Sequence, residues 1–554
     1  MKENRLYRLL TLIGCQAQLV LVLSVFPQLL YAQILPPPPA EPGPERQLAA
    51  AARLFVRGYQ FEGNHAFSSE ELSQVAKPYT GRELGSDELQ QLRRVLTLHY
   101  VSRGYVNSGA LIPDQNPGDG IVRIRIVEGT VGKIDIHGNK WLRDHYIRSH
   151  LKRWSKPPLN LPELQEGLQL LRQNPNVSQI NAELQPGSSV SQALLDLRVQ
   201  DQQPFRAGLQ FDNQRPPSVG ALEISALVAD MNLTGNSDPL QFRYGIVNSG
   251  PDGLEFSGVD NLDGSYELPI TRYDTTLGFH GSRLNTSLIE DPFVDLNVKS
   301  LTETIGFGLR QPLYQSPRDV VAVSVGFDHR QNQTWLLDEP FNISPGAVDG
   351  QMVVSVLRLA QEWVHRGPNK VLALRSTFNV GLPIWDATNN GIAGEPNGEF
   401  FSWLGQGQYV QRLFNTQNEV ILRLSGQWTD EPLLALEQLS VGGFYTVRGY
   451  FENQLVRDRG IIASVEVRLP VLFQKSGAPM LSLAPFLDFG GAWNVRESPS
   501  PSTIYSVGVG LLFAVSKYVS ADIYWGYRLQ HINEPSDAGL QDYGIGFRIN
   551  LWAL

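Results

Sequence analysis

Apolar and polar side chains alternate at every second position over most of the chain from Phe205 onward. Between Val519 and Leu529, for example, the odd-numbered residues are apolar or aromatic, whereas Asp522 and Arg528 lie among the even-numbered ones. Successive side chains of a β-strand point to opposite faces, so this pattern predicts strands with one apolar and one polar face. The periodicity of a helix is missing from the same region. We therefore expect the C-terminal part of the chain to be almost entirely β-structure.

The lengths of the connections favour a membrane barrel over a soluble β-sandwich. We predict sixteen strands, which start near residues 205, 219, 240, 256, 273, 296, 318, 351, 370, 400, 418, 460, 481, 503, 518 and 540. Connections after even-numbered strands are mostly tight (316–317, 367–369), and those after odd-numbered strands mostly long (337–350, 430–459). Bacterial outer-membrane barrels have short periplasmic turns, long surface loops and an apolar face toward lipid. A sandwich has no reason for such parity, so residues 205–554 are predicted to form a transmembrane β-barrel of sixteen antiparallel strands with both ends in the periplasm.

An internal repeat precedes this region. The segment Phe61-Glu62-Gly63-Asn64 recurs as Ile136-His137-Gly138-Asn139, and the two copies are 75 residues apart. In each copy a strand is followed by two helical stretches and then by further strands, which predicts two α+β modules at residues 55–131 and 132–202. Glycine tolerates positive φ, so we expect turns at Gly63, Asn64, Gly138 and Asn139 between the first strand and the first helix. Two unrelated turns would not explain the repeated order of elements.

The N-terminus has the pattern of a secretory signal peptide over residues 1–32. Basic residues at the start precede a dense apolar stretch at 19–26, and cleavage is expected after Ala32. The sole cysteine, Cys15, lies in this segment, so the mature chain can form no disulfide. A lipoprotein acylation site at Cys15 is the weaker interpretation, because the stronger apolar run follows this residue. Residues 33–54 are a Pro-rich linker, in which 45–54 could form a short Ala-rich helix.

The predicted loop at 430–459 differs from an ordinary surface loop because it is apolar and rich in glycine. It contains the motif Val447-Arg448-Gly449-Tyr450. An apolar segment of this size would be a liability in water, whereas it is reasonable if the loop folds back into the barrel. Arg448 would then need a carboxylate partner, because an unpaired buried charge is costly.

Asp488 is the candidate for that partner. It lies in the strand segment Phe486-Leu487-Asp488-Phe489-Gly490, and it faces the lumen if Leu487 and Phe489 face lipid. A guanidinium group and a carboxylate match in a bidentate geometry, so Arg448 and Asp488 are predicted to form a latch that holds the loop. Spacing alone leaves a second interpretation open, in which Arg448 lies in a surface hairpin and Asp488 ends a strand.

Taken together, the loop motif at 447–450 and the strand motif of Phe486, Asp488 and Gly490 resemble the paired motifs of the outer-membrane protein-assembly and secretion superfamily. Two polypeptide-transport-associated (POTRA) modules before a sixteen-stranded barrel resemble its two-partner secretion branch, the haemolysin and filamentous-haemagglutinin secretion pores. The resemblance covers residues 55–554. It implies that Arg448 contacts Asp488 and that the POTRA modules, in the periplasm, capture an extended partner by strand addition. Members often have an N-terminal plug helix, but only residues 33–54 are available for one here.

The resemblance implies that the chain secretes an unfolded partner protein, expected to be a large β-helical exoprotein, from the periplasm to the cell surface. Its other expected partners are the lipid of the cell outer membrane and the barrel-assembly machinery during its biogenesis. The main alternative is an insertase that folds other barrels into the membrane, which shares both motifs but usually carries more modules. A passive porin is a third class, and it would need no periplasmic modules.

Other classes of function find little support in the sequence. The net charge of -9 gives no indication of nucleic-acid binding. After residue 30 no uncharged apolar run reaches the roughly 18 residues that a membrane helix needs. The nine histidines are scattered, and neither a phosphate-binding loop nor a Gly-x-Ser-x-Gly segment occurs. We therefore expect no enzymatic activity and no cofactor or metal.

Overall fold

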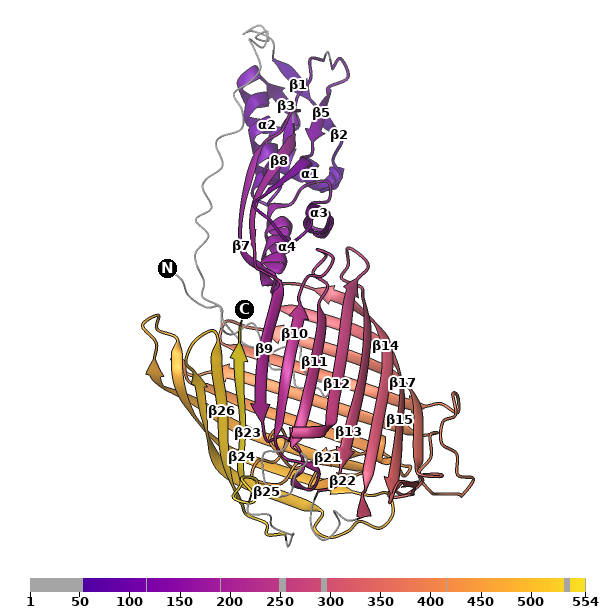
Figure 1. The fold of residues 1–554 in the computed structure, drawn as a ribbon. Helices are drawn as coiled ribbons and strands as arrows, with labels where there is room; N and C mark the ends of the chain where they lie inside the picture. Colours follow the sequence, from indigo (N-terminus) through magenta and orange to yellow (C-terminus); the bar gives the residue numbers. More distant parts are fainter. Residues whose placement is uncertain are drawn as a thin grey trace. The chain divides into compact units, whose positions relative to one another are not determined.

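A computed structural model describes residues 53–115, 117–189, 191–248, 256–289, 296–414, 416–532 and 539–553. These residues fall into two compact units, one before and one after Pro204 (Figure 1). The predicted signal peptide and most of the Pro-rich linker lie outside the described residues. No helix in the described part of the chain is long and apolar enough to cross a membrane.

The first repeat copy is a three-stranded sheet covered by two helices. Its elements are β2 (Gly58–Glu62), α1 (Ser69–Ala76), the 3-10 helix η2 (Lys77–Tyr79), α2 (Ser86–Val101), β4 (Gly109–Leu111) and β5 (Ile121–Val127), and the sheet order is β2-β5-β4. A separate pair of short strands, β1 (Leu54–Val56) and β3 (Arg82–Leu84), lies beside them. The prediction that Leu54 ends a linker helix is therefore wrong, because its backbone pairs with Leu84.

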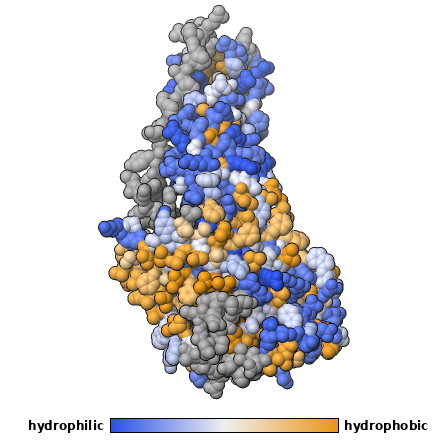
Figure 2. Space-filling view, viewed as in Figure 1, coloured by the Kyte–Doolittle hydropathy of each residue, from blue (hydrophilic) through white to orange (hydrophobic). Residues whose placement is uncertain are grey.

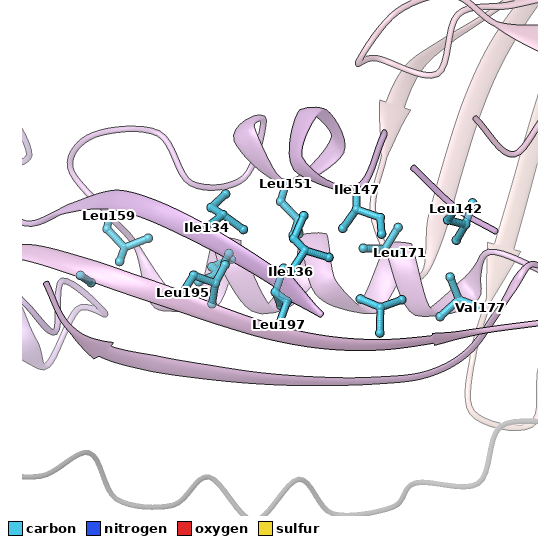
Figure 3. Packing of buried hydrophobic residues seen from close by; sticks show 13 residues of the cluster. Ile134, Ile136, Leu142, Ile147, Leu151, Leu159, Leu171, Val177, Leu195 and Leu197 are labelled. Atoms are coloured by element: carbon cyan, nitrogen blue, oxygen red, sulfur yellow. The ribbon is translucent and has the colours of Figure 1, made fainter. Parts of the chain in front are cut away.

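The second copy repeats this topology. Its elements are β6 (Thr130–His137), α3 (Asp144–Lys152), α4 (Leu161–Gln173), β7 (Val177–Pro186) and β8 (Gln192–Asp201), with sheet order β6-β8-β7. In both copies the first and last strands are parallel neighbours. Figure 3 shows the core of the second copy, in which Ile136 and Leu197 of the sheet face Ile147 and Leu171 of the two helices. Alternate strand residues and one face of each helix thus enclose a dry core.

The Gly-Asn turns have the same geometry in both copies. Gly63 has a φ of 80° and Gly138 has a φ of 89°. A Cβ atom on Gly63 would lie 2.5 Å from the carbonyl oxygen of Ile126, so the turn needs glycine both for its backbone conformation and for space. The side-chain amide of Asn64 donates to the carbonyl of Phe67 at 2.9 Å, and that of Asn139 donates to the corresponding carbonyl three residues later at 2.7 Å.

Each turn is also held by a carboxylate that the sequence analysis did not single out. Glu128 accepts hydrogen bonds from the backbone N–H groups of His65 and Ala66, both at 2.7 Å. In the second copy Asp201 accepts from the backbone N–H groups of residues 140, 141 and 142 at 2.6 to 3.0 Å. Burial, together with the Glu128 carboxylate, raises the pKa of Tyr100, which remains a hydroxyl donor to Glu128 at 3.2 Å. The repeat therefore extends to the groups that stabilise the turn.

Among the described residues after Pro204, sixteen main strands close into one antiparallel barrel, as predicted (Figure 1). They are β9 (Phe205–Asp212), β10 (Glu223–Asp230), β11 (Leu240–Asn248), β12 (Phe256–Pro269), β13 (Thr276–Ser287), β14 (Lys299–Gln315), β15 (Asp319–Leu336), β17 (Gln351–Arg366), β18 (Lys370–Gly381), β19 (Phe401–Arg412), β20 (Glu419–Thr429), β23 (Arg459–Phe473), β24 (Pro479–Trp493), β25 (Thr503–Ala514), β26 (Val519–Arg528) and β27 (Ile545–Trp552). The short strand β16 (Glu339–Pro340) pairs with β15, and a 3-10 helix η3 (Pro217–Val219) lies in the first connection. Strand β27 pairs with β9 and closes the ring. The last strand, predicted near residue 540, begins later because 540–544 form a turn in which Gly544 has a φ of 74°.

The barrel exposes its apolar side chains and turns its polar ones inward. Phe307 is 52% exposed and Tyr527 is 58% exposed, although both lie within strands. In contrast, Glu466 of β23 and Asp488 of β24 point to the inner face of the barrel and are fully buried. Figure 2 shows hydrophobic residues gathered in a band over the barrel wall. An apolar outer band around a polar interior is the arrangement that a lipid bilayer requires.

Candidate functional site

The connection between β20 and β23, residues 430–458, crosses the bore of the barrel. It contains the 3-10 helix η5 (Ala435–Glu437) and a short hairpin of β21 (Leu439–Val441) and β22 (Leu455–Arg457). On one side Arg330 of β15 donates to the carboxylate of Glu437 at 3.0 Å. On the other side Arg528 of β26 donates to the carbonyl of Gly449 at 2.6 Å. Strands β15 and β26 are opposite each other in the ring, so the surface-hairpin interpretation of this segment is wrong.

The apolar residues of this loop are packed within the barrel. Leu433 and Leu434 belong to a buried cluster with Met352, Val354 and Val356 of β17. Further along the loop, a second buried cluster joins loop and wall residues: Val441, Val447, Tyr450, Leu455, Ile462, Ala492 and Ile504. The loop is therefore apolar because it packs inside the barrel against two apolar patches of the inner wall.

Arg448 of the loop and Asp488 of β24 form a bidentate ion pair. The Nε of Arg448 donates to Oδ2 of Asp488 at 2.7 Å, and its Nη2 donates to Oδ1 at 2.8 Å. The backbone N–H of Arg448 also donates to Oδ2, at 3.0 Å. Asp488 is 0% exposed and Arg448 is 4% exposed. Ser464 of β23 donates to Oδ1 of Asp488 at 2.6 Å, so both carboxylate oxygens have two partners.

A second carboxylate, Glu466 of β23, completes the site. Nη1 of Arg448 donates to Oε2 of Glu466, and Nε of Arg468 donates to Oε1 at 2.7 Å. Arg423 of β20 lies 3.6 Å from the same carboxylate. Glu466 was not among the residues singled out from the sequence. Its position on the polar face of β23, on the strand that pairs with that of Asp488, was the available signal, but the register of the two strands was not known from the sequence.

Two aromatic rings flank the Arg448 guanidinium group. Its Cζ atom lies 3.7 Å from the ring centroid of Phe486 on β24 and 4.7 Å from that of Tyr524 on β26. The face of an aromatic ring attracts a cation, so the strand motif supplies a ring as well as a carboxylate. The hydroxyl of Tyr524 reaches Oε2 of Glu466 at 3.3 Å. Arg448 is therefore fixed by charge, by hydrogen bonds and by stacking.

The other motif residues allow the loop to approach the wall closely. Gly449 has a φ of 93°, and a Cβ atom at this position would lie 2.5 Å from the carbonyl oxygen of Gly526 on β26. Gly490 of β24 leaves space for Val441 and Val447, which a Cβ atom would overlap. The Tyr450 hydroxyl donates to the carbonyl of Gln530 at 2.7 Å. The loop therefore rests on a surface of the barrel that is lined by glycine.

The predicted site residues thus form two groups. Residues of the loop motif and of the strand motif, far apart in the sequence, meet inside the barrel, whereas the four turn residues belong to the N-terminal unit. Within the described ranges no group of three or more His, Cys, Asp or Glu side chains is arranged to hold a metal ion.

Comparison with known families identifies the chain. Residues 191–513 match the model of the haemolysin secretion/activation protein ShlB/FhaC/HecB, and residues 54–129 match the ShlB-type POTRA domain. The chain belongs to the haemolysin secretion/activation protein family. The first repeat copy is accordingly a POTRA domain, and the second copy has the same architecture.

Three similar proteins are transporters. The outer membrane transporter CdiB of Dickeya dadantii (strain 3937) is 21% identical over 510 residues, which cover 90% of this chain and 86% of that protein. The hemolysin transporter protein ShlB of Serratia marcescens is 22% identical over 476 residues, which cover 84% of this chain and 81% of that protein. The heme/hemopexin transporter protein HuxB of Haemophilus influenzae (strain 86-028NP) is 24% identical over 473 residues, which cover 81% and 79% of the two chains.

Solved structures agree on the fold. CdiB from Escherichia coli aligns with a TM-score of 0.69 at 19% identity and covers 93% of this chain and 94% of that chain. BamA from Haemophilus ducreyi, lacking POTRA domains 1–3, aligns with a TM-score of 0.52 at 13% identity and covers 90% of this chain and 100% of that chain. These similarities show the fold alone.

The family determines the function at the level of the class. The chain is an outer-membrane transporter of two-partner secretion, which exports a partner protein to the cell surface and has its POTRA modules in the periplasm. The insertase alternative is supported only by likeness of fold, whereas the family model that matches most of the barrel is that of a secretion protein.

Proposed function

We propose that loop 430–458 is the closed gate of this secretion pore and that Arg448 and Asp488 are its latch. An unfolded partner chain is first held by the periplasmic modules, the loop then leaves Asp488, and the partner passes through the bore. One observation carries this proposal. Arg448, which lies within a loop that crosses the lumen, bonds to two buried carboxylates of the barrel wall. A loop bonded to opposite walls must shift before an extended polypeptide can pass.

The edges of the module sheets are suited to hold an extended partner. In the second module β7 is an outer strand of the order β6-β8-β7, and its ten residues make it the longer of the two edges. Strand addition uses backbone N–H and C=O groups, so it can accept many sequences while the partner is unfolded. Ser178, Gln179, Asn181 and Glu183 expose polar side chains along β7, which leaves the edge accessible to water and to a partner.

Folding of the partner outside the cell would make its passage unidirectional. We expect the partner to be a large β-helical exoprotein, because a chain that buries its apolar side chains after exit no longer fits through the pore. A neighbouring gene for a very large, repetitive, β-rich secreted protein would support this assignment. The barrel-assembly machinery remains the expected partner during biogenesis, since the outward-facing alternation of β27 is typical of strands that this machinery reads.

The test is secretion of that partner by the variant Arg448→Ala. We expect a folded barrel that no longer exports, because Asp488 and Glu466 lose their shared cation and the loop loses its defined closed position. Barrel folding is checked by the heat-dependent shift in electrophoretic mobility, and export by the amount of partner in the medium.

The matched control is Arg375→Ala. Arg375 faces the lumen from β18 and lies 3.6 Å from Glu362 of β17, so it is a lumen arginine whose ion pair lies within the barrel wall. This variant should export the partner at the parental level. Normal export by Arg448→Ala would remove the latch from the mechanism.

A further inference from the structure

A second ion-pair network binds loop 430–458 near its beginning, at Glu437. It contains no residue of the loop motif or of the strand motif. Oε1 of Glu437 accepts a hydrogen bond from Arg330 of β15 at 3.0 Å and one from Arg358 of β17 at 2.9 Å. Its Oε2 accepts a second bond from Arg358, at 3.1 Å. Arg358 is oriented in turn by Asp328 of β15. Glu437 is buried, and both of its carboxylate oxygens are therefore bound to arginine.

The backbone around Glu437 is tied to the base of the loop. Gln427, on β20, donates from Nε2 to the carbonyl of Glu437 at 2.9 Å and to the carbonyl of Asp458 at 3.0 Å. The Asp458 carboxylate accepts from the backbone N–H of Leu433 at 3.0 Å and from the side chain of Gln438 at 2.9 Å. The beginning and the end of the loop are thus joined to each other. We call this group of residues (Gln427, Leu433, Glu437, Gln438, Asp458) the base.

The base and the segment around Arg448, which we call the tip, differ in how far each could move away from the barrel wall. Glu437 is eight positions after Thr429, the last residue of β20, whereas Arg448 is nineteen positions after Thr429 and eleven before Arg459, the first residue of β23. An extended chain spans at most about 3.3–3.6 Å per residue, so even the shorter arm of the tip can reach further than the arm that ends at Glu437. The tip is also the part that rests on glycine, with backbone of Gly449 against backbone of Gly526. That backbone contact itself has no interlocked side chain, so the side chains of Arg448, Val447 and Tyr450 hold the tip on the wall.

We propose that Glu437 is the positioning residue that keeps the base of the loop docked on β15 and β17 while the tip around Arg448 is released. The loop then opens as a hinged flap and does not leave the bore as a whole. The base, which stays bound to the wall, returns Arg448 to Asp488 after each passage. This inference rests on the proposed gating by loop 430–458, and it assigns the residue about which that movement turns.

The two ends of the loop can be observed separately with single cysteines. The sequence contains one cysteine, Cys15, so a cysteine added to the Cys15→Ser background is the sole thiol. Leu434→Cys reports on the base, because Leu434 is 0% exposed within the cluster on β17. Val447→Cys reports on the tip, because Val447 is also 0% exposed. The probe is a maleimide-polyethylene glycol reagent, applied to the full-length protein in phosphatidylethanolamine and phosphatidylglycerol vesicles, and the rate of labelling is measured.

Four variants are combined with the two reporters. In Arg448→Ala the tip reporter should label about a hundredfold faster than in the parent, because loss of one member of a buried ion pair shifts the opening equilibrium by about two powers of ten or more. The base reporter should remain protected in this variant. In Glu437→Gln the base reporter should become reactive by a similar factor.

Glu362→Gln is the matched control for Glu437→Gln. Glu362 also lies between two arginines, with Arg310 at 2.9 Å and Arg375 at 3.6 Å, but these three residues all belong to the barrel wall. Both reporters should stay protected in this variant. All variants must show the heat-dependent mobility of a folded barrel, and Glu437→Asp, which retains the charge, should restore at least part of the protection of the base.

The outcomes separate this inference from the proposed gate. If Arg448→Ala exposes both reporters, the loop leaves as a whole and the hinge at Glu437 is wrong. If Glu437→Gln leaves the base reporter protected, Glu437 is not its anchor. The labelling pattern is independent of secretion, so the hinge can be correct even if Arg448→Ala exports its partner normally, which would contradict the latch alone.

Discussion

The two units of this molecule place their apolar side chains on opposite sides. In the periplasmic modules most of the large, fully buried side chains are aliphatic, such as Leu96 and Ile147. In the barrel many large apolar side chains are on the outer face, and the fully buried groups include the carboxylates Glu466 and Asp488. The strands of both units have the same two-residue alternation. The difference shows that alternation predicts the strand and its two faces, whereas the surroundings decide which face is inside.

The same comparison explains what stabilises each unit. A module encloses its apolar face because water surrounds it, and the half-buried carboxylates of Glu128 and Asp201 accept hydrogen bonds from backbone turns. The barrel is surrounded by lipid, so its inner face can carry charge, and that charge must be paired where the loop excludes water. Substitution of one side chain should therefore change the stability of the two units in different ways.

The largest effect is expected from Asp488→Ala. This substitution leaves Arg448 without its bidentate partner, and breaking a buried pair in this way costs roughly 3–5 kcal/mol. The cost falls on the docking of the loop, because the outer face and the strand pairing of the barrel are unchanged. We expect a folded barrel with increased ion conductance in planar lipid bilayers. An unfolded barrel would mean that the loop contributes to the stability of the wall itself, contrary to this comparison.

Leu96→Ala should destabilise the first module by roughly 2–5 kcal/mol, because it leaves a cavity in a closed core. The matched substitution in the barrel is Leu424→Ala, at an outward position that is 55% exposed on β20. There lipid replaces the lost atoms, so no cavity forms and the effect should be smaller. Limited proteolysis in urea follows the modules, and electrophoretic mobility follows the barrel. Equal losses at both positions would contradict the assignment of outer and inner faces.

Leu424→Arg should cost roughly 2–4 kcal/mol, because it places a cation on the lipid-facing side near the middle of a strand. The adjacent residue, Arg423, already carries this charge on the inner face, within 3.6 Å of Glu466. One step along β20 thus separates a tolerated arginine from a destabilising one. The measurement is the urea concentration at which the barrel unfolds in lipid vesicles. An unchanged midpoint would indicate that residue 424 does not face lipid.

The sequence allowed the architecture to be predicted because its main signals are local. Alternation and loop parity predicted sixteen strands, and the described part of the barrel has this number of main strands. The inward direction of Asp488 followed from its neighbours Leu487 and Phe489 in the same strand. Leu54 was predicted wrongly because an Ala-rich segment favours a helix locally, whereas pairing with β3 is a tertiary contact.

The partners of the loop were less accessible to sequence reasoning. Glu466 and Glu437 both bind arginines that are distant in the chain, and these contacts depend on strand register and on the path of the loop through the bore. Alternation places Glu466 on the inner face but does not say which loop residue lies above it. Glu437 belongs to no strand, so its burial against Arg330 and Arg358 followed from no periodic pattern. Contacts of this kind need the three-dimensional structure.

The smallest effect is expected from the substitution of a glycine on the inner face of the barrel, and a second glycine on this face provides the control. A Cβ atom on Gly526 of β26 would lie 2.6 Å from the carbonyl oxygen of Arg448 and 2.8 Å from the Cα of Gly449, whereas one on Gly278 of β13 would meet nothing within 4 Å. Overpacking of this kind costs roughly 1–3 kcal/mol. Gly526→Ala should therefore lift the tip of the loop and raise the ion conductance in planar bilayers, although by less than Asp488→Ala does.

Gly278→Ala is the control, because it adds the same methyl group to the same inner face, where the bore is open. It should leave both conductance and unfolding unchanged. If the two substitutions had the same effect, the closed state would not depend on backbone contact between Gly449 and Gly526. If Gly526→Ala alone opens the pore, then the glycines of the inner wall determine where the loop can rest, just as the glycine turns of the modules determine where a strand can end and a helix begin.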